Sequence, residues 1–186
     1  MKELDMRFNQ NIFSSFINKK MKKYKCDPFV YTSSVHGMVG LYIDDKIYEI
    51  NNEQESVDYF GVTDDYAVFK FHETTDDNVK SLLKDVEQIT TKINKKIKKI
   101  VLVNENQQIF ENEIQIYNVW LTRAIIFFFE DGKELMFQKD ITPFSEEIDI
   151  RKGYDLIKEI PSQATFLEGW NKGLTPKCNR EIITLD

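Results

Sequence analysis

Two short motifs in this chain place acidic residues beside a lysine, in a pattern that could support metal-dependent chemistry. Asp44-Asp45-Lys46 and Asp131-Gly132-Lys133 match the short half of a nuclease pattern, in which carboxylates hold a metal ion. Both motifs fall where the sequence predicts hairpin turns, whereas metal ligands should point from strands into a cleft. Asp44, Asp131 and Lys133 therefore stand as the candidates for an alternative hypothesis, a metal-dependent enzyme acting on nucleic acid or nucleotides.

Other groups that could perform catalysis or bind metal are few. His36 and His72 are the only histidines, and neither has a cysteine or carboxylate at the spacing of a zinc motif. Cys26 and Cys178 lack neighbours that would activate a thiol, and a single bridge between them is left open. The chain contains no glycine-rich phosphate loop and no Gly-x-Ser-x-Gly motif. We therefore expect no catalytic residue, no metal and no cofactor.

The charge distribution favours binding over catalysis. The net charge is −6, but residues 1–25 hold seven basic and two acidic groups, a balance of +5 that leaves −11 for the rest. An acidic body repels the phosphates of nucleic acid and attracts basic proteins. We therefore expect a basic protein partner and no binding of nucleic acid.

Acidic residues in two stretches are the candidate contacts for such a partner. The five candidates are Asp64, Asp65, Glu146, Glu147 and Asp149. An acidic surface of this kind can dock a basic protein or simply keep the chain in solution, and the sequence leaves both readings open. The leading hypothesis is a non-enzymatic intracellular binding protein, and its most concrete version is an immunity protein that neutralises a toxin. Opposite charges would give the fast association that such a role needs.

Lysine-rich tracts at 19–25 and 92–99 form the other charged feature of the sequence. We interpret both as the C-terminal ends of helices, where the helix dipole favours positive charge. A further alternative is a mobile-element accessory protein that contacts nucleic acid through a basic N-terminal helix.

Hydrophobic spacing predicts three helices. Residues 6–24 place apolar side chains at helical intervals, with Asp5 as the N-cap. A second stripe of period 3.6 runs over residues 76–94, and residues 162–170 predict a short third helix that Ser162 would cap.

Alternating and apolar runs predict several strands. Residues 38–50 alternate and fold back at an Asp-Asp turn, and residues 119–139 form a hairpin whose turn is Asp-Gly. Within it, Ala124–Phe129 is apolar on both faces, which is typical of a buried central strand. Residues 104–118 are polar and predict a loop. Because the strands come in hairpins, we expect an α+β fold with a mostly antiparallel sheet, in a single domain over residues 1–186.

Bulk features predict a cytoplasmic protein. The longest apolar run has six residues, whereas a membrane span needs about 20. The N-terminus shows no signal peptide, and two cysteines fit a reducing compartment. The excess of lysine over arginine, 21 to 4, indicates the coding bias of an AT-rich bacterial genome.

Residues 103–149, about a quarter of the chain, resemble small uncharacterised proteins of low-GC bacteria. The resemblance rests on Asn104-Glu105-Asn106-Gln107, on Val119-Trp120-Leu121-Thr122-Arg123, and on the Phe-Gln-Lys-Asp…Phe-Ser-Glu-Glu run at 137–147. No activity is known for such proteins, so the resemblance implies no functional residue. The oligomeric state is left open.

Overall fold

The protein is built mainly of strands. The computed structural model describes residues 3–29, 32–59, 62–141 and 144–186, without the side chains of Tyr59, Val62 and Asp64. Strands account for 62% of the structure and helix for only 7%. The predicted α+β fold with three helices is therefore wrong.

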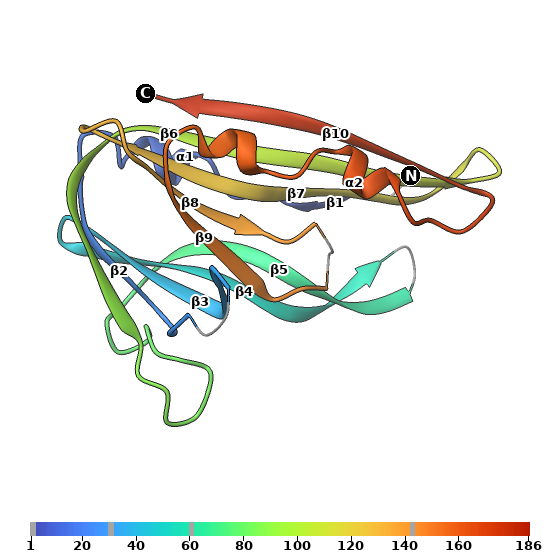
Figure 1. The fold of residues 1–186 in the computed structure, drawn as a ribbon. Coiled ribbons are helices and arrows are strands. Elements are labelled where there is room, and N and C mark those ends of the chain that lie inside the picture. Colours follow the sequence, from blue (N-terminus) through green and yellow to red (C-terminus); the bar gives the residue numbers. More distant parts are fainter. Residues whose placement is uncertain (1–2, 30–31, 60–61, 142–143) are drawn as a thin grey trace.

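The elements follow one another as a series of strands interrupted by short turns of helix (Figure 1). In chain order they are β1 (Leu4–Met6), α1 (Asn11–Ser14), β2 (Lys20–Cys26), β3 (Ser34–Ile43), β4 (Lys46–Tyr59), β5 (Val62–Thr74), β6 (Ile89–Glu111), β7 (Ile114–Phe129), β8 (Glu134–Lys139), β9 (Glu147–Gly153), the 3-10 turn η1 (Leu156–Glu159), α2 (Ala164–Leu167) and β10 (Leu174–Leu185).

The strand pairings return on themselves to form a ring. From β6 the order runs through β7, β8, β9, β3 and β2, and β2 pairs with β6 again. β6 closes the ring because its residues 89–96 pair with β2 and its residues 97–111 pair with β7. Figure 1 shows β6 bending from the lower layer of strands into the upper one. The β4–β5 hairpin extends from β3, β10 extends from β6, and β1 runs parallel to β7, which makes the sheet mixed.

The prediction that Ala124–Phe129 is buried on both faces is confirmed for most of its length. Ile125 and Phe127 face the main core inside the ring, whereas Ala124 and Ile126 face a second core that η1 covers. Phe128 alone is half-buried, beneath the ammonium group of a lysine. The hairpins predicted at 38–50 and 119–139 are also confirmed, because β3 pairs with β4 and β7 pairs with β8.

The predicted N-terminal helix over residues 6–24 is wrong. Only Asn11–Ser14 is helical, and Asp5, the predicted N-cap, lies in β1 instead. Asn18 has a φ of 65°, which ends the helical path, and β2 follows from Lys20. The apolar residues of this stretch are shared between a short helical turn and a strand, so their helical spacing has no single structural cause.

The predicted middle helix over residues 76–94 is also wrong. Residues 75–88 form turns and bends, and β6 begins at Ile89. The apolar stripe contacts two different places, since Val79 packs against β3 from outside whereas Ile93 contacts the main core. Ile and Thr at 89–91 favour extended backbone, which the helical spacing obscured.

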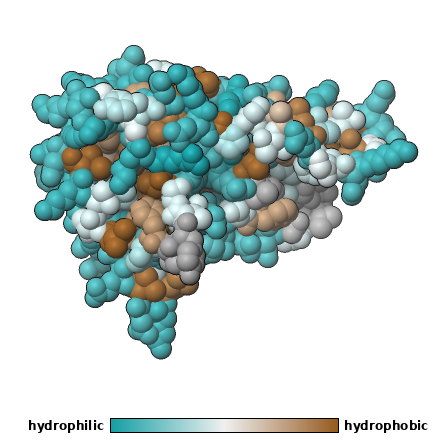
Figure 2. Space-filling model, in the orientation of Figure 1, coloured by the Kyte–Doolittle hydropathy of each residue, from teal (hydrophilic) through white to brown (hydrophobic). Residues whose placement is uncertain are grey.

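Two further segments differ from expectation. Of the helix predicted at 162–170, only the four residues of α2 are helical. Residues 104–118, predicted as a loop, belong to β6 and β7 and to the hairpin turn between them. Among the described residues, no helix is long and apolar enough to cross a membrane. Figure 2 shows a largely hydrophilic face, on which hydrophobic residues are scattered rather than gathered in one large patch.

Gly40 of β3 allows a test of how the 75–88 segment rests on the sheet. A Cβ atom added at Gly40 would lie 2.3 Å from Val79 Cγ1, so Gly40→Ala should force Val79 away from the sheet. We expect the free energy of unfolding to fall by about 1–3 kcal/mol, the usual cost of overpacking, and trypsin to cleave the segment faster. The control is Gly153→Ala, whose Cβ would meet its nearest neighbour at an ordinary 3.5 Å. Equal cleavage of the two variants would contradict the contact.

Candidate functional site: an acidic hollow where β9 meets β3

A buried arginine lies where β7 exchanges one neighbour for another. Arg123 is an extra residue in β7, because Ala124 pairs with Val103 and Thr122 pairs with the next residue, Asn104. On the other side of β7, pairing with β8 ends at Ala124, and pairing with β1 covers residues 119–121. The bulge therefore turns Arg123 into the gap between β8 and β1.

Arg123 is held there by a carboxylate and a carbonyl. Its side chain is fully buried, its Nε lies 3.2 Å from Glu105 Oε2, and one of its terminal nitrogens donates to the carbonyl of Lys139. Glu105 also accepts hydrogen bonds from Arg180 of β10, at 2.5 Å and 3.1 Å. Burial lowers the pKa of Arg123, and the charge of Glu105 opposes that shift. The odd arginine of an apolar strand is thus one member of an internal charge cluster.

Lys139 fills a second gap, where β4 and β9 lie end to end along one edge of β3. β3 pairs with β9 through Ser34–His36 and with β4 from Gly37 onward. Lys139 Nζ donates to Asn52 Oδ1 at 3.2 Å and to the carbonyl of Ser145 at 3.1 Å. Burial and, after it, the charge of Arg123 lower the pKa of Lys139 to about 7, and the charges of Asp140 and Glu146 oppose this shift.

An acidic hollow of about 320 Å³ lies beside this second gap. Its walls come from the end of β8, from β9 and from the segment that enters β3. Three carboxylates line it, those of Asp140, Glu147 and Asp149, together with the hydroxyl-bearing residues 32–34 and the amide of Gln138. Arg151 and Pro161 complete the lining, so oxygen-bearing side chains outnumber the one cationic group that a ligand in this hollow would meet.

One of the three carboxylates is already neutralised. Asp149 accepts hydrogen bonds from Arg151 Nε at 2.6 Å and from the hydroxyl of Ser33. Arg151 also donates to Glu159 at 2.8 Å, and these hydrogen bonds, that of Glu159 first, raise the pKa of Arg151. With Asp140 and Glu147, the lining of the hollow holds three carboxylates against one guanidinium group.

Gln138 gives the hollow a buried acceptor. Gln138 is 6% exposed, and its Oε1 has no hydrogen-bond donor among the described residues. A buried amide oxygen without a donor costs about 1–3 kcal/mol, so native structures seldom contain one. An acceptor of this kind beside two carboxylates is suited to a ligand that carries several N–H groups and a positive charge.

Of the five predicted docking residues, two line the hollow, a third precedes them in the chain, and a fourth lies on the β4–β5 hairpin. Glu147 and Asp149 line the hollow, and the preceding Glu146 accepts a hydrogen bond from the backbone of Gln54 in β4, at 3.1 Å. The fourth, Asp65 of β5, bonds to the hydroxyl of Ser56, two residues further along β4. The side chain of Asp64 lies outside the described residues.

Sequence reasoning missed two residues of the hollow, Gln138 and Asp140. A signal was present, because Gln138 directly follows the apolar run of β8, and a polar side chain in a central strand is buried together with that strand. The five predicted residues were chosen for charge alone. A neutral amide was therefore outside the search.

The residues proposed for the enzyme hypothesis do not gather into a site. Asp44 accepts a hydrogen bond from the backbone of Lys20 at 2.9 Å. Asp131 pairs with Lys95, whose hydrogen bond lowers the pKa of Asp131, and exposed Lys133 donates its backbone N–H to the same carboxylate. Across the described ranges there is no group of three or more His, Cys, Asp or Glu residues that could hold a metal ion.

The two cysteines are free thiols. Cys26 is buried in the main core and Cys178 is half-buried in β10. Burial raises the pKa of each thiol to about 12. Because the thiolate is the nucleophilic form, neither cysteine is prepared for catalysis.

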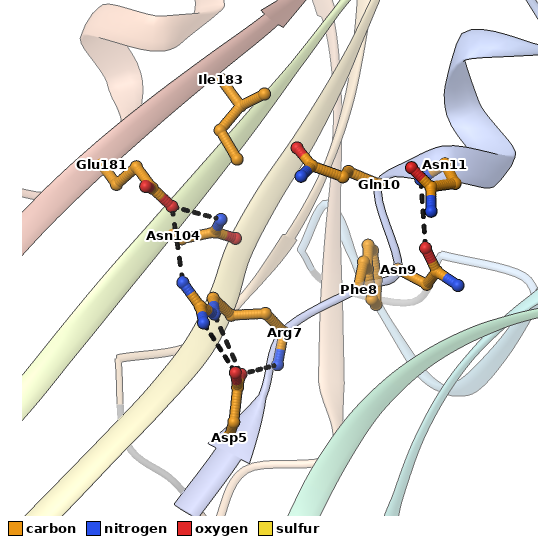
Figure 3. A pocket seen from close by; sticks show the side chains of 9 residues that line it. All are labelled: Asp5, Arg7, Phe8, Asn9, Gln10, Asn11, Asn104, Glu181 and Ile183. Carbon is orange, nitrogen blue, oxygen red and sulfur yellow. Dashed lines mark hydrogen bonds and ion pairs between the residues drawn. The ribbon is translucent and has the colours of Figure 1, made fainter. Parts of the chain in front are cut away.

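A larger hollow of about 530 Å³ lies between the N-terminal segment and the strands β6 and β10, but its charged groups already satisfy one another (Figure 3). Arg7 donates to Asp5 at 2.9 Å and 2.6 Å, lies 3.7 Å from Glu181, and stacks over Trp120. The hydrogen bond from Arg7 lowers the pKa of Asp5. Asn104 in turn donates to Glu181 at 3.1 Å. These contacts bind the N-terminal segment to the sheet and leave little charge for a ligand.

Comparisons with known proteins give no functional assignment. No protein-family model, no curated protein and no solved structure matches the chain.

The buried ammonium group of Lys139 allows a test by pH. An unfolded lysine has a pKa of about 10.4, whereas the folded value is about 7. Between pH 7 and pH 9 the unfolded chain therefore holds a proton that the folded chain lacks, so stability rises with pH. We expect the advantage of the wild type over Lys139→Met to grow by about 2 kcal/mol across this range and to stop changing below pH 6. Urea unfolding at each pH measures it, and a constant difference would mean that Lys139 stays charged.

Proposed function

We propose that this chain is a non-enzymatic binding protein that docks a basic partner protein by taking a lysine or arginine side chain into the acidic hollow. The observation that carries the proposal is the buried Gln138 Oε1, which has no donor within the described part of the chain and belongs to the same lining as Asp140 and Glu147. A guanidinium group has five N–H donors in a rigid plane, so it can donate to a carboxylate and, once the buried amide of Gln138 turns toward the hollow, to the amide oxygen as well. An arginine side chain therefore suits the hollow better than a lysine side chain does.

Charge around the hollow supports the same partner class. Glu146 lies beside the hollow against β4, and β4 itself carries Glu53, Glu55 and Asp58. Asp65 of β5 bonds to the same strand. A field of one sign steers an oppositely charged protein toward the site and raises the association rate, an effect that salt weakens. Neutralisation of a basic toxin is the specific form of this proposal that the sequence first suggested.

The alternative of a metal-dependent enzyme has less support. Its candidate residues lie at hairpin turns. There Asp44 accepts a hydrogen bond from the backbone of Lys20, and Asp131 pairs with the ammonium group of Lys95. No observation in the described residues places them around a common centre.

Arginine-rich and lysine-rich hexapeptides are suitable probes for the hollow. We expect the side-chain amide signals of Gln138 to shift in NMR spectra when hexa-arginine is added, and to shift less with hexa-lysine. Glu147→Lys should weaken binding at least tenfold and flatten its salt dependence, because it reverses one of the charges that face the ligand. The control Glu113→Lys makes the same change in net charge at the exposed turn between β6 and β7. Equal affinity of the two variants would reject the hollow as the docking site.

Gln138→Leu separates a binding role from a structural one. Leucine removes a buried acceptor that has no donor, so this variant should be as stable as the wild type or more stable, by about 1 kcal/mol. It should nevertheless bind hexa-arginine more weakly. A loss of stability in thermal unfolding, or unchanged peptide affinity, would show that the amide serves the fold and not the ligand.

A further inference from the structure

The two lysine-rich tracts of the sequence, predicted as separate helix ends, lie side by side as antiparallel strands. Lys20 of β2 pairs with Lys96 of β6, and Lys23 pairs with Lys92. Met21, which lies between the two β2 positions, is fully buried, so the lysines point outward. They form a lysine face, which we define as Lys20, Lys23 and Lys25 of β2 with Lys92, Lys96 and Lys98 of β6.

The strands that carry the lysine face are unusually rich in lysine. Segments 19–25 and 89–99 together hold ten lysines and no acidic residue. Like charges directly opposite each other on paired strands are destabilising, by up to about 1 kcal/mol per pair. The arrangement therefore costs stability, and a polyanion bound to the face would offset that cost.

Acidic neighbours neutralise only part of the lysine face. Lys25 pairs with Asp76 at 2.7 Å, and Lys23 lies over the ring of Tyr42. Within the described part of the chain, Lys20, Lys92 and Lys96 make no side-chain ion pair, and all three are exposed. These three lysines would be the main ones to meet a ligand, with Lys23 and Lys98 beside them.

The net negative charge of the protein does not cancel this local positive charge. The acidic hollow lies at the Ser34 end of β3, whereas Lys20 lies beside its other end, because Ile43 of β3 pairs with Met21. Nine residue steps of about 3.3 Å separate the two ends of β3, or about 30 Å. Salt at physiological strength screens charges beyond about 8 Å, so the hollow contributes little to the potential at the lysine face. The acidic groups close to the face are those of Asp44 and Glu130, which accept the backbone N–H groups of Lys20 and Lys96.

We infer that the lysine face binds the phosphate backbone of nucleic acid. Alternate residues of a strand repeat at about 6.6 Å, and neighbouring strands lie about 4.8 Å apart, so the lysines form two rows suited to a linear polyanion. β2 and β6 belong to a broader sheet that cannot enter a groove as a ribbon does, so the contacts are to phosphates and carry no sequence preference. The inference departs from the expectation, drawn from net charge alone, that nucleic acid would not bind.

The surroundings of the face favour nucleic acid over an anionic membrane. Exposed Leu82 and Leu83 lie in the segment that leads into β6 and could insert between lipids. Asp77, Asp85 and Glu87 share that segment, however, and would be repelled by anionic headgroups. Vesicle binding is thus the outcome that would count against the inference.

The test measures binding of a fluorescent DNA duplex of about 20 base pairs by anisotropy, over a series of salt concentrations. Four or five phosphate contacts predict that log affinity falls against log salt with a slope of about −4. Replacing Lys20, Lys92 and Lys96 together by glutamine should weaken binding at least tenfold and bring the slope close to −1. The control replaces Lys70, Lys158 and Lys172 by glutamine, which gives the same loss of charge away from the face, and it should bind within twofold of the wild type.

Three results would overturn the inference: no duplex binding by the wild type at low salt, equal loss of binding in the two triple variants, or tighter binding to phosphatidylserine vesicles than to the duplex. Thermal unfolding serves as the folding control, and the lysine-face variant should be at least as stable as the wild type because it relieves repulsion. The result does not depend on the acidic hollow, since Glu147→Lys leaves all six lysines in place and should not weaken binding of the duplex.

Discussion

The double pairing of β6 holds this fold together. One strand of 23 residues supplies its first part to β2 and its second part to β7, and this closes the ring around the main core. Without that closure, β2 and β3 would form one layer and β7 and β8 another, each with an apolar face in water. The aromatic core contributed by β7, β8 and α1 is buried because both layers share this strand.

Closing a ring with strands of unequal length leaves places where one neighbour ends before the next begins. Backbone groups at such places must still find partners, because an unpaired buried carbonyl costs as much as a lost hydrogen bond. Arg123 and Lys139 meet this need from inside, and Glu105 balances the charge of the first. The acidic hollow lies next to the second of these gaps, so the features that solve a packing problem also frame the site.

Sequence reasoning predicted the central strand and two hairpins because alternation and turn residues are local signals. It failed where one apolar spacing had two causes, as in residues 76–94, whose apolar residues contact opposite sides of the sheet. It also misread residues 104–118 as a loop, because their polar side chains enter a buried network that no local pattern reveals. Glu147 and Asp149 were predictable from charge, whereas the importance of Gln138 depends on neighbours that are distant in sequence.

The position of β10 has a consequence for the order in which the chain folds. β10 follows the other described strands in the chain, yet its Arg180 supplies the second counter-charge of buried Glu105. Until β10 has left the ribosome, the carboxylate of Glu105 lacks this partner and one edge of β6 stays open. Pairings as distant as Leu4 with Val119 add slow loop closure to this delay. The pairing of β10 with β6 is therefore the folding step that excludes water from the cluster of Arg123, Glu105 and Arg180.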